Sequence, residues 1–422
     1  MSASDSTTLA FVSWPTAPLT ESLVLRAIQR LSPSPKVVSS LPQINPDNKL
    51  LQWSTYDDMD HELTHIRRSS VLASSYIIRK ALIRKHFLSR TIHAYLTKHP
   101  DSILKEASPR TYEIEISYAD ELDEIFADEL YDLEQDLEQG RWWILKPGMA
   151  DRGNGIRLFN SREALTKIFE DFEDDSEDED EEKDVGTGVV TSQLRHFVVQ
   201  VLFSHQFHLR AYCVASGALT LYLFDRILAL FSSVPYTPPQ PSSDDVNIDL
   251  APHLTNTSLQ THRGEEGVRL LDELATFTKA HIADIVSQMT QILSETFKAA
   301  MANPVHFQPI PNAFELFGVD FLVQHNPAAE TAPGTQPFLV KLLEINAEPA
   351  IELTGPRLAW ILEDLFVAIG KQCVQPFLDG RREGGDGEPK DAQKEGNAEG
   401  EKTEDEDETS HLIACLQEIR GA

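Results

Sequence analysis

The sequence has no stretch of about 18 or more consecutive apolar residues, the length that a helix needs to cross a bilayer. Its first residues, MSASDSTTLA, lack the positive start and the apolar stretch of a secretory signal. We therefore expect no membrane segment and a cytoplasmic location. With 422 residues, of which 41% are hydrophobic, the chain is long enough to form two or three folded modules.

Cysteine is also scarce. Cys213, Cys373 and Cys415 are odd in number and far apart in the sequence. A disulfide framework uses an even set of cysteines, and a cysteine-based metal site uses closely spaced pairs, so the sequence favours neither. We interpret the three residues as ordinary thiols.

Basic residues are outnumbered, because 37 lysines and arginines stand against 67 aspartates and glutamates, which gives a net charge of −30. The acidic excess is confined to residues 111–139, 170–184 and 383–408, which together carry −32 and leave +2 for the rest of the chain. A locally basic cleft that binds an anion is therefore compatible with the acidic total.

Hydrophobic periodicity predicts mainly helices before residue 140. A short apolar strand, LAFVSW, precedes an amphipathic helix that starts near Thr20. A second helical region is predicted over residues 69–98, and an amphipathic helix whose acidic face we interpret as solvated surface over residues 120–138. The second region holds a cluster of bases, namely Arg79, Lys80, Arg84, Lys85 and Arg90.

After residue 140, short apolar runs predict strands: RWWILK, GIRLF, RHFVVQVLF, HLRAYCVA, LTLYLFDRIL, ELFGVDFLV and PFLVKLLEIN. A helix with a core-facing apolar stripe is predicted over residues 266–301. The acidic run 170–184 has too little apolar content to pack, which predicts a disordered insertion, and residues 380–410 predict a linker of the same kind. The apolar segment HLIACLQEI that follows predicts a terminal helix.

Two carboxylates and an amide lie at the ends of the last two predicted strands. Glu344 and Asn346 are two residues apart, so their side chains project from one face. The loop between the strands joins them as an antiparallel pair and can bring Asp320 opposite Glu344 and Asn346. Acids at strand ends are often only solvated, but oxygen ligands without histidine or cysteine suit Mg²⁺. Because the flanking sequence is strongly apolar, these polar residues favour a metal site.

Lys146 ends the run WWILK and is followed by a loop that contains Gly153 and Gly155. A β-hairpin with an Asn154-Gly155 turn is one interpretation. The other is a loop whose backbone amides approach an anion while the lysine binds phosphate oxygens. The sequence has no GxxxxGK[ST] motif and no third glycine in a strand-to-helix step, which excludes a P-loop and a dinucleotide-binding fingerprint.

Arg210, in the run HLRAYCVA, can bind a carboxylate or a phosphate through two parallel hydrogen bonds. By itself, this arginine is weak evidence for a binding site. In sequence order, however, a lysine strand, a glycine loop, an arginine strand, an aspartate strand and a Glu-x-Asn strand form a set that chance rarely produces.

This order resembles the tubulin-tyrosine ligase family, whose catalytic core has the ATP-grasp fold. The matching segments are SYIIRKALIRK, WILKPGMADRGNGIRLF, FVVQVLF, FHLRAYCVA, HLTN, FELFGVDFLV and LLEINAEPAI. The resemblance implies an α+β (α/β) fold with antiparallel sheets, flanking helices and a small N-terminal α/β domain. The implied divisions are an N-terminal domain, a central subdomain, a C-terminal subdomain and an acidic linker with a short tail, at residues 1–78, 79–203, 204–380 and 381–422.

The resemblance also implies roles for individual residues. Those implied to bind ATP are Lys80, Lys146, Arg152, Gly153, Gly155, Gln200, Val201 and Asn256. Those implied to hold Mg²⁺ are Asp320, Glu344 and Asn346. Those implied to act in catalysis are Arg210, Lys146 and Glu344. Family members activate a carboxylate as an acyl phosphate, which an amine then attacks to form an amide.

Two departures from the family pattern lie on the acceptor side of the implied site. The family usually has Lys-Phe-Asp before the strand arginine, whereas Gln206, Phe207 and His208 stand here. A further family arginine falls in the segment FDRILALFSS, where Arg226 is the available residue. The resemblance therefore supports ATP binding more directly than the identity of the amino acid that is added.

The first functional hypothesis is an ATP-dependent ligase that adds tyrosine to the acidic tail of α-tubulin. The acidic stretches of this chain would repel such a tail unless they lie away from the cleft. The second hypothesis is an ATP-binding adaptor whose partners are mRNA-decay factors, because fungal proteins of this type are associated with cytoplasmic mRNA-decay bodies (P-bodies). A third is ligation onto another peptide or a small acid. We expect no direct binding of nucleic acid.

Overall fold

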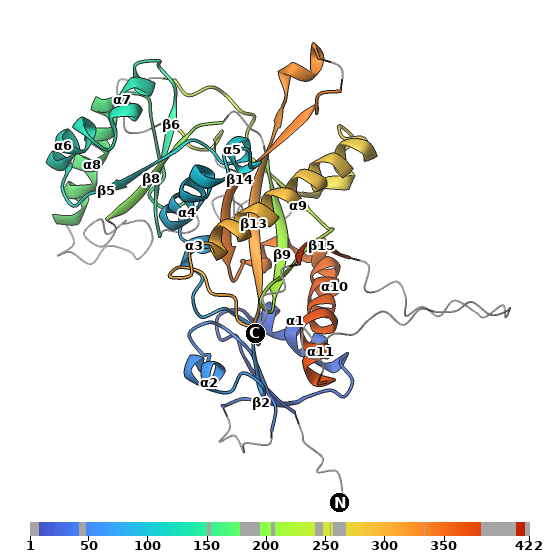
Figure 1. Cartoon of the computed structure of the whole chain (residues 1–422). Coiled ribbons are helices and arrows are strands. Elements are labelled where there is room, and N and C mark those ends of the chain that lie inside the picture. Colours follow the sequence, from blue (N-terminus) through green and yellow to red (C-terminus); the bar gives the residue numbers. More distant parts are fainter. Residues whose placement is uncertain are drawn as a thin grey trace, which may run out of the picture.

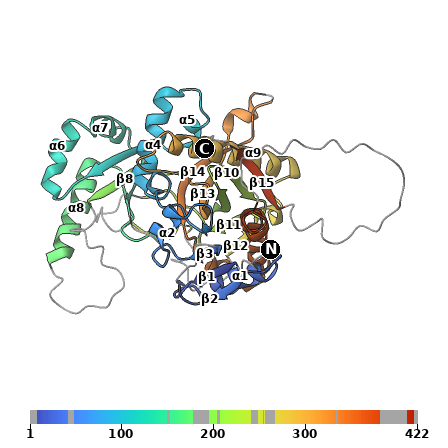
Figure 2. The same ribbon diagram turned by 60° about the horizontal axis from the view of Figure 1, so that its bottom comes forward.

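Three β-sheets organise the chain (Figure 1). The structure is a computed structural model, and it describes residues 8–41, 48–149, 153–177, 195–203, 207–240, 248–253, 255, 267–332, 334–380 and 411–417. Figures 1 and 2 both show the second sheet and its helices as a lobe to one side of the large third sheet.

The N-terminal sheet is parallel, with strand order β2-β1-β3-β4. Its strands are β1 (Leu9–Ser13), β2 (Lys36–Val38), β3 (Leu50–Ser54) and β4 (Val71–Ala73). Helices α1 (Pro18–Gln29) and α2 (His61–Ile66) lie between these strands in the sequence. Parallel strands need such crossover connections, so the predicted α/β character of this region is confirmed, as are the strand LAFVSW and the helix near Thr20.

The second sheet is antiparallel, with strand order β5-β8-β6-β7. Its strands are β5 (Thr111–Glu115), β6 (Trp143–Pro147), β7 (Arg157–Phe159) and β8 (His196–Val201). One face shares a hydrophobic core with α6 (Leu122–Ala127), α7 (Tyr131–Leu137) and α8 (Arg162–Glu177). Helix α4 (Lys85–Lys98) adjoins the opposite face, where Arg90 forms an ion pair with Glu113 of β5.

The third sheet has seven strands. Its main path is β12 (Val268–Leu270), β11 (Leu228–Phe231), β9 (Phe207–Ser216), β10 (Thr220–Phe224) and β15 (Leu412–Gln417). Strand β13 (Phe314–His325) pairs with both β9 and β14 (Phe338–Ala347).

Both faces of the third sheet are covered by helices. Leu209, Ala211 and Cys213 of β9 belong to the core with α9 (Lys279–Met301), whereas Tyr212 and Val214 belong to the core with α1 and α10 (Ala359–Ile369). This alternation is the two-residue period of a strand that is buried on both faces. The remaining helical elements are α3 (Lys80–Ile83), α5 (Leu104–Ala107), α11 (Gln375–Leu378), η1 (Ala119–Glu121), η4 (Leu271–Glu273), η5 (Pro327–Glu330), η6 (Ile351–Thr354), η7 (Pro356–Leu358) and η8 (Gly370–Val374).

Two predicted helices begin later than periodicity suggests. The region 69–98 opens with β4, which pairs in parallel with β3, and helical structure starts only at Lys80. The region 266–301 opens with β12 and η4, and α9 starts at Lys279, where the Thr278 side chain accepts a hydrogen bond from the backbone of His281. In both cases a short apolar run pairs with a distant strand, and this pairing overrides the local helical pattern.

Three other predictions also need correction. The helix over 120–138 is divided into η1, α6 and α7, although its apolar stripe is buried as expected. The acidic run 170–184 continues α8 as far as Glu177, because the preceding turns anchor the helix in the core, and residues 178–184 lie outside the described residues. The segment HLIACLQEI forms the edge strand β15 rather than a helix, because it pairs with β10.

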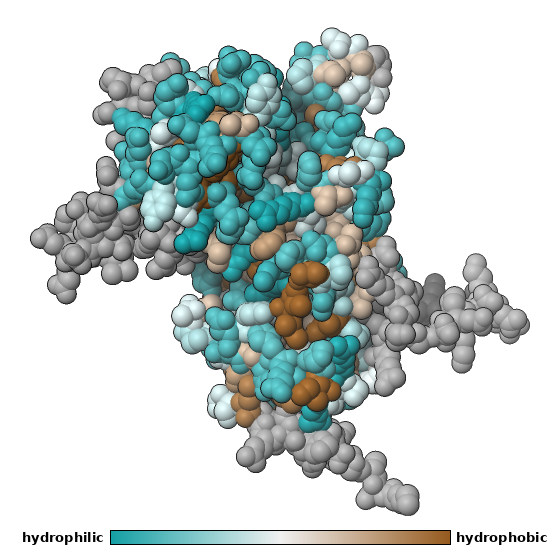
Figure 3. Space-filling model, turned by 60° about the vertical axis from the view of Figure 1, so that its left-hand side comes forward, coloured by the Kyte–Doolittle hydropathy of each residue, from teal (hydrophilic) through white to brown (hydrophobic). Residues whose placement is uncertain are grey.

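The surface is mainly hydrophilic on the face shown in Figure 3, with small hydrophobic patches in its lower half. Among the helices that the structure describes, none has the length and apolar character that would let it cross a membrane.

The pairing of β15 with β10 makes a testable contribution to stability. Leu416 is the buried side chain of β15, whereas the neighbouring Gln417 is exposed. We expect Leu416→Ala to lower the free energy of unfolding by about 2 kcal/mol, because it leaves a cavity under the sheet edge. The measurement is urea unfolding, with Gln417→Ala as the control. Equal effects of the two substitutions would contradict the docking of this strand.

Candidate active site

Three neighbouring strands of the large sheet hold charged side chains in one row. Asp320 of β13 lies opposite Arg210 of β9 on one side and opposite Glu344 of β14 on the other. The expected antiparallel pairing of Asp320 with Glu344 is therefore confirmed. Asn346 donates from Nδ2 to Glu344 Oε1 at 3.2 Å and to Asp320 Oδ2 at 3.4 Å. The three residues predicted to hold a metal are thus in mutual contact.

Arg210 binds Asp320 through two hydrogen bonds. Its Nε lies 2.5 Å from Asp320 Oδ1, and its Nη2 lies 2.9 Å from Asp320 Oδ2. Burial disfavours the charged guanidinium, but Asp320 outweighs this effect and raises the pKa of Arg210. Gly318 gives Pro349 room, because a Cβ there would lie only 2.7 Å from Pro349 Cβ, and it would be in ordinary van der Waals contact with Arg210 Cδ at 3.5 Å. The pair is a buried, charge-assisted contact of the kind that fixes a side chain precisely.

Two lysines surround Glu344. Lys85, the first residue of α4, places its Nζ 3.1 Å from Glu344 Oε2. Lys146, on β6 of the second sheet, donates from Nζ to Gln200 Oε1 at 2.9 Å and attracts Glu344 electrostatically. Burial alone would raise the pKa of Glu344, but the two lysines outweigh it and lower that pKa. The site therefore lies where the second and third sheets meet.

Lys146 itself is strongly affected by burial. Desolvation lowers its pKa to about 8, although the attraction of Glu344 acts in the opposite direction. Gln200, which accepts its hydrogen bond, also donates to Thr111 Oγ1 at 3.2 Å. Gln200 and Val201 end β8, and Gln200 contacts the lysine implied to bind phosphates, whereas Val201 pairs with Trp143.

His208 occupies the place where the family usually has an aspartate. Its Nε2 lies 3.6 Å from Asp320 Oδ1, and its Nδ1 lies 2.5 Å from Thr255 Oγ1. Burial lowers the pKa of His208, so the neutral imidazole is favoured. A neutral ring thus touches the charged row where an acid is expected, which removes one negative charge from the site. Gln206 lies outside the described residues.

The glycine loop after β6 is described only at its end. Gly153 and Gly155 have φ values of 81° and 69°, a backbone conformation that glycine adopts without strain. The residues from Ala150 to Arg152 lie outside the described residues, as does Asn256. The phosphate-binding roles of Arg152, Gly153, Gly155 and Asn256 remain predictions.

Two predicted residues lie apart from the charged row. Lys80 is exposed at the start of α3. Arg226 places its guanidinium 5.6 Å from the ring centre of Trp360 on α10, and its Nε lies 3.6 Å from Asp225 Oδ1. The role of Lys80 stays a prediction, and the structure gives Arg226 contacts with α10.

Lys85 is the site residue that sequence reasoning missed. The segment RKALIRK contains two Arg-Lys pairs five residues apart, and the pattern gives no reason to prefer the second pair. The feature that distinguishes Lys85 from Lys80 is the position at which α4 begins. Lys85 begins α4 and reaches Glu344, whereas Lys80 begins the separate short helix α3 and is exposed.

This fold and this arrangement of charged residues define a protein of the ATP-grasp class. The crystal structure of the C-terminal domain from K. lactis Pby1 matches with a TM-score of 0.67 and 29% identity, covering 98% of this chain and 100% of that domain. That domain is described as an ATP-grasp enzyme that interacts with the mRNA decapping enzyme Dcp2. This chain therefore has the ATP-grasp fold, as expected.

The chain belongs to the tubulin-tyrosine ligase family, whose sequence model matches residues 60–381. It is 37% identical over 391 residues to the probable tubulin–tyrosine ligase PBY1 of Saccharomyces cerevisiae, covering 84% of this chain and 50% of that protein. It is also 37% identical over 381 residues to a probable tubulin–tyrosine ligase of Schizosaccharomyces pombe, covering 82% of this chain and 89% of that protein. The chain thus spans about half the length of the first relative and most of the second.

The oxygen donors of Asp320, Glu344 and Asn346 are of a type that can bind Mg²⁺. The described residues contain no group of three or more His, Cys, Asp or Glu side chains suited to a metal. Asp320, Glu344 and Asn346 instead offer two carboxylates and an amide, a set of hard oxygen donors that suits Mg²⁺. Asn346 can present its carbonyl oxygen after a flip of the amide, since nitrogen and oxygen are assigned from hydrogen bonding.

The pairing of Arg210 with Asp320 can be tested without any ligand. We expect Asp320→Ala to lower the free energy of unfolding by about 3 kcal/mol, because it leaves a buried guanidinium without a partner. The double variant Asp320→Ala/Arg210→Ala should be less destabilised than the sum of the two single variants, as measured by denaturant unfolding. Strict additivity would show that the two side chains do not interact in solution.

Proposed function

We propose that this protein is an ATP- and Mg²⁺-dependent carboxylate–amine ligase that adds tyrosine to the C-terminal tail of α-tubulin. The observation that carries the proposal is the charge of the row. Two carboxylates, Asp320 and Glu344, lie among three cations, Arg210, Lys85 and Lys146, so the cluster carries an excess positive charge. Such a cluster suits a metal-bound polyphosphate, whose phosphates take the lysines while its metal takes the carboxylates.

Each side chain has a defined task in this proposal. Lys85 and Lys146 bind phosphate oxygens, while Asp320, Glu344 and Asn346 hold the metal. Mg²⁺ held by these three residues would supply positive charge that stabilises the transferring phosphoryl group. Arg210, fixed by Asp320, orients the carboxylate that receives the phosphoryl group. Transfer of the γ-phosphoryl group of ATP to this carboxylate would release ADP and form an acyl phosphate. The amine of the incoming tyrosine would then attack the acyl carbon, so that the C–O bond to the phosphate breaks, an amide forms, and inorganic phosphate and a proton leave.

The position of the acidic helices α6 and α7 is compatible with the binding of an acidic acceptor peptide at the site. Leu145 and Val199 of the second sheet face the core with α6 and α7, whereas Lys146 and Gln200 alternate to the opposite face. The acids of α6 and α7 therefore lie across the sheet from Lys146, at the outer edge of the lobe in Figure 1. An acidic peptide can approach the site without meeting these helices directly.

A second candidate function is that of an ATP-binding adaptor for mRNA-decay factors in cytoplasmic P-bodies. His208 favours it, because a buried neutral imidazole takes the place of an acid on the acceptor side. The similarity to K. lactis Pby1, described as interacting with Dcp2, points to the same class of partner. In this function the ATP site would stabilise the fold or regulate partner binding rather than catalyse ligation.

The affinity for ATP tests which of the two lysines in the segment RKALIRK, Lys80 or Lys85, binds the nucleotide. We expect Lys85→Ala to weaken the binding of ATP with Mg²⁺ at least tenfold, because it removes a charge-assisted contact to phosphate. Lys80→Ala, at the exposed lysine that the family resemblance implies, should weaken this binding less than Lys85→Ala does, because Lys80 makes no contact with Glu344 in the structure. Isothermal titration calorimetry measures both. If the wild-type protein bound no ATP, or if Lys80→Ala were the weaker binder, the assignment of Lys85 would be wrong.

Ligation is tested by the transfer of labelled tyrosine to detyrosinated tubulin. We expect the purified protein to incorporate the label, and Glu344→Gln to abolish incorporation because it removes a metal ligand and a charge. Gln417→Ala, far from the site on the edge strand, should retain activity. Binding of ATP without any incorporation by the wild type would reject the ligase and favour the adaptor.

A further inference from the structure

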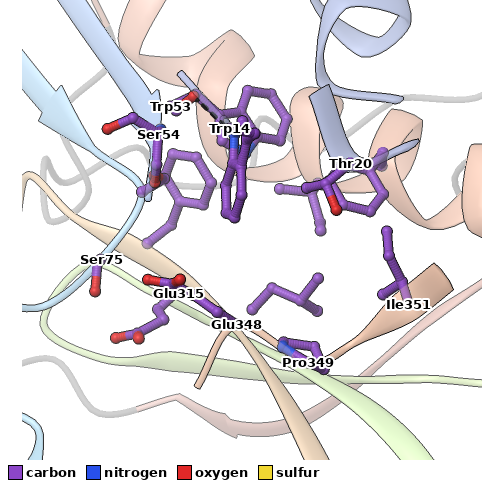
Figure 4. A pocket seen from close by; sticks show the side chains of 14 residues that line it. Trp14, Thr20, Trp53, Ser54, Ser75, Glu315, Glu348, Pro349 and Ile351 are labelled. Carbon is purple, nitrogen blue, oxygen red and sulfur yellow. Dashed lines mark hydrogen bonds between the residues drawn. The ribbon is translucent and has the colours of Figure 1, made fainter. Parts of the chain in front are cut away.

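Buried side chains hold the segment from Arg79 to His86 at both of its ends. At the first end, Arg79 is buried, and its Nη1 lies 2.8 Å from Glu315 Oε1. Glu315 and Glu348 line a pocket where the N-terminal sheet meets the third sheet, and Figure 4 shows their carboxylates beside each other at one end of it. Arg79 thus fixes the start of the segment at that junction.

At the second end, His86 is buried on α4, directly after Lys85. The residue is 4% exposed, and its ring stacks on that of His196 of β8, with the ring centroids 4.6 Å apart and an angle of 16° between the planes. Burial lowers the pKa of His86 to about 4, and the charges of His196 and Arg90 act in the same direction. The ring is therefore neutral near pH 7, and it acts through packing rather than through charge.

Gly148 packs against this ring just after the end of β6. A Cβ at Gly148 would lie 2.8 Å from His86 Nδ1 and 2.9 Å from the backbone oxygen of His196, so a side chain there would force its neighbours to move. The N–H of Gly148 donates to the same oxygen at 2.7 Å. His86 Nδ1 has no hydrogen-bond partner among the described residues, so its contact with Gly148 is one of close packing.

This contact joins the two elements that carry the lysines of the site. Lys85 precedes His86 on α4, and Lys146 precedes Gly148 by two residues on β6. Burial lowers the pKa of Lys146, and the charge of Lys85 acts in the same direction, so the two ammonium groups lie within electrostatic reach of each other. The separation of the two lysines therefore depends on how closely His86 approaches Gly148.

A second contact between α4 and the second sheet constrains this distance less. Arg90 lies more than one turn further along the helix and forms an ion pair with Glu113 of β5. The arginine side chain is half exposed, and ion pairs with exposed side chains hold a geometry only weakly. The buried ring of His86 is the tighter link between the helix and the sheet.

We propose that His86 is a positioning residue for nucleotide binding, because its contact with Gly148 sets the separation at which Lys85 and Lys146 can bind the phosphates of one ATP molecule. The inference rests on the proposed function, in which both lysines bind phosphate oxygens. A lysine binds phosphate as a point charge, so its contribution falls as the distance grows. Loss of the ring would let α4 shift relative to β6, and Lys85 would lose part of its contact.

The test is the binding of ATP with Mg²⁺ to the full chain, measured by isothermal titration calorimetry. We expect His86→Ala to weaken this binding about fivefold, the effect of a displaced rather than a deleted charge. His93→Ala, at an exposed histidine of the same helix, is the matched control and should bind as the wild type does. His86→Phe keeps a flat ring against His196 and should bind more tightly than His86→Ala.

A double-mutant cycle separates positioning from a general effect on the fold. In the Lys85→Ala background, His86→Ala should weaken ATP binding less than about twofold, because the lysine through which it acts is gone. Equal losses in the two backgrounds, or unchanged affinity of His86→Ala, would overturn this inference alone if Lys85→Ala still weakened binding. Absence of ATP binding by the wild type would overturn the proposed function and this inference together.

Gly148→Ala tests the same contact if His86→Ala does not fold. The added methyl group would push His86 and the backbone of His196 away, so we expect the affinity for ATP to fall about fivefold. Gly370→Ala is the matched control, since a Cβ there would make only ordinary contacts, the nearest at 3.5 Å from Leu31. Equal affinities of the Gly148→Ala and Gly370→Ala variants would refute the proposal.

Discussion

The antiparallel register of β9, β13 and β14 is the constraint on which the site depends. Side chains alternate between the two faces of a strand, so a slip of one residue would turn Asp320 away from Arg210 and Glu344. The apolar neighbours prevent this slip. Phe317, Val319 and Phe321 are completely buried against the core with α9, and a slip of one residue would turn them out of that core and turn Asp320 into it. Hydrophobic packing on one face of the sheet thus fixes the positions of the charged side chains on the other face.

The ion pairs of the charged row also show how the protein stabilises buried charges in the absence of a ligand. Each carboxylate is matched by a cation, Asp320 by Arg210 and Glu344 by Lys85, which offsets the cost of removing charge from water. Under the proposed function, the same contacts would loosen on binding of phosphates and a metal, because both lysines and both carboxylates would then change partners. The affinity for nucleotide would be a difference between two sets of ion pairs, and its net value would be smaller than the individual contacts suggest.

Sequence reasoning succeeded where the signal is local and failed where it depends on distant partners. The apolar runs around Asp320 and Glu344 were sufficient to predict two strands, their pairing and the contact of the two acids. The start of α9 and the strand β12 could not be read from periodicity, because Val268 and Leu270 are buried by pairing with β11, a strand some forty residues earlier. Lys85 was missed for a similar reason, since its partner is more than two hundred residues away.

The edge strand β15 has a consequence for the order in which the chain can fold during synthesis. Strand β10 ends at Phe224, whereas its outer neighbour begins at Leu412, so a ribosome must add almost two hundred residues between them. Throughout that interval the β10 edge offers unpaired backbone groups to any extended segment nearby. Until residues 412–417 have been translated, this edge stays without the strand that covers it, and among the strands that the structure describes the last one to be made is the one that closes it.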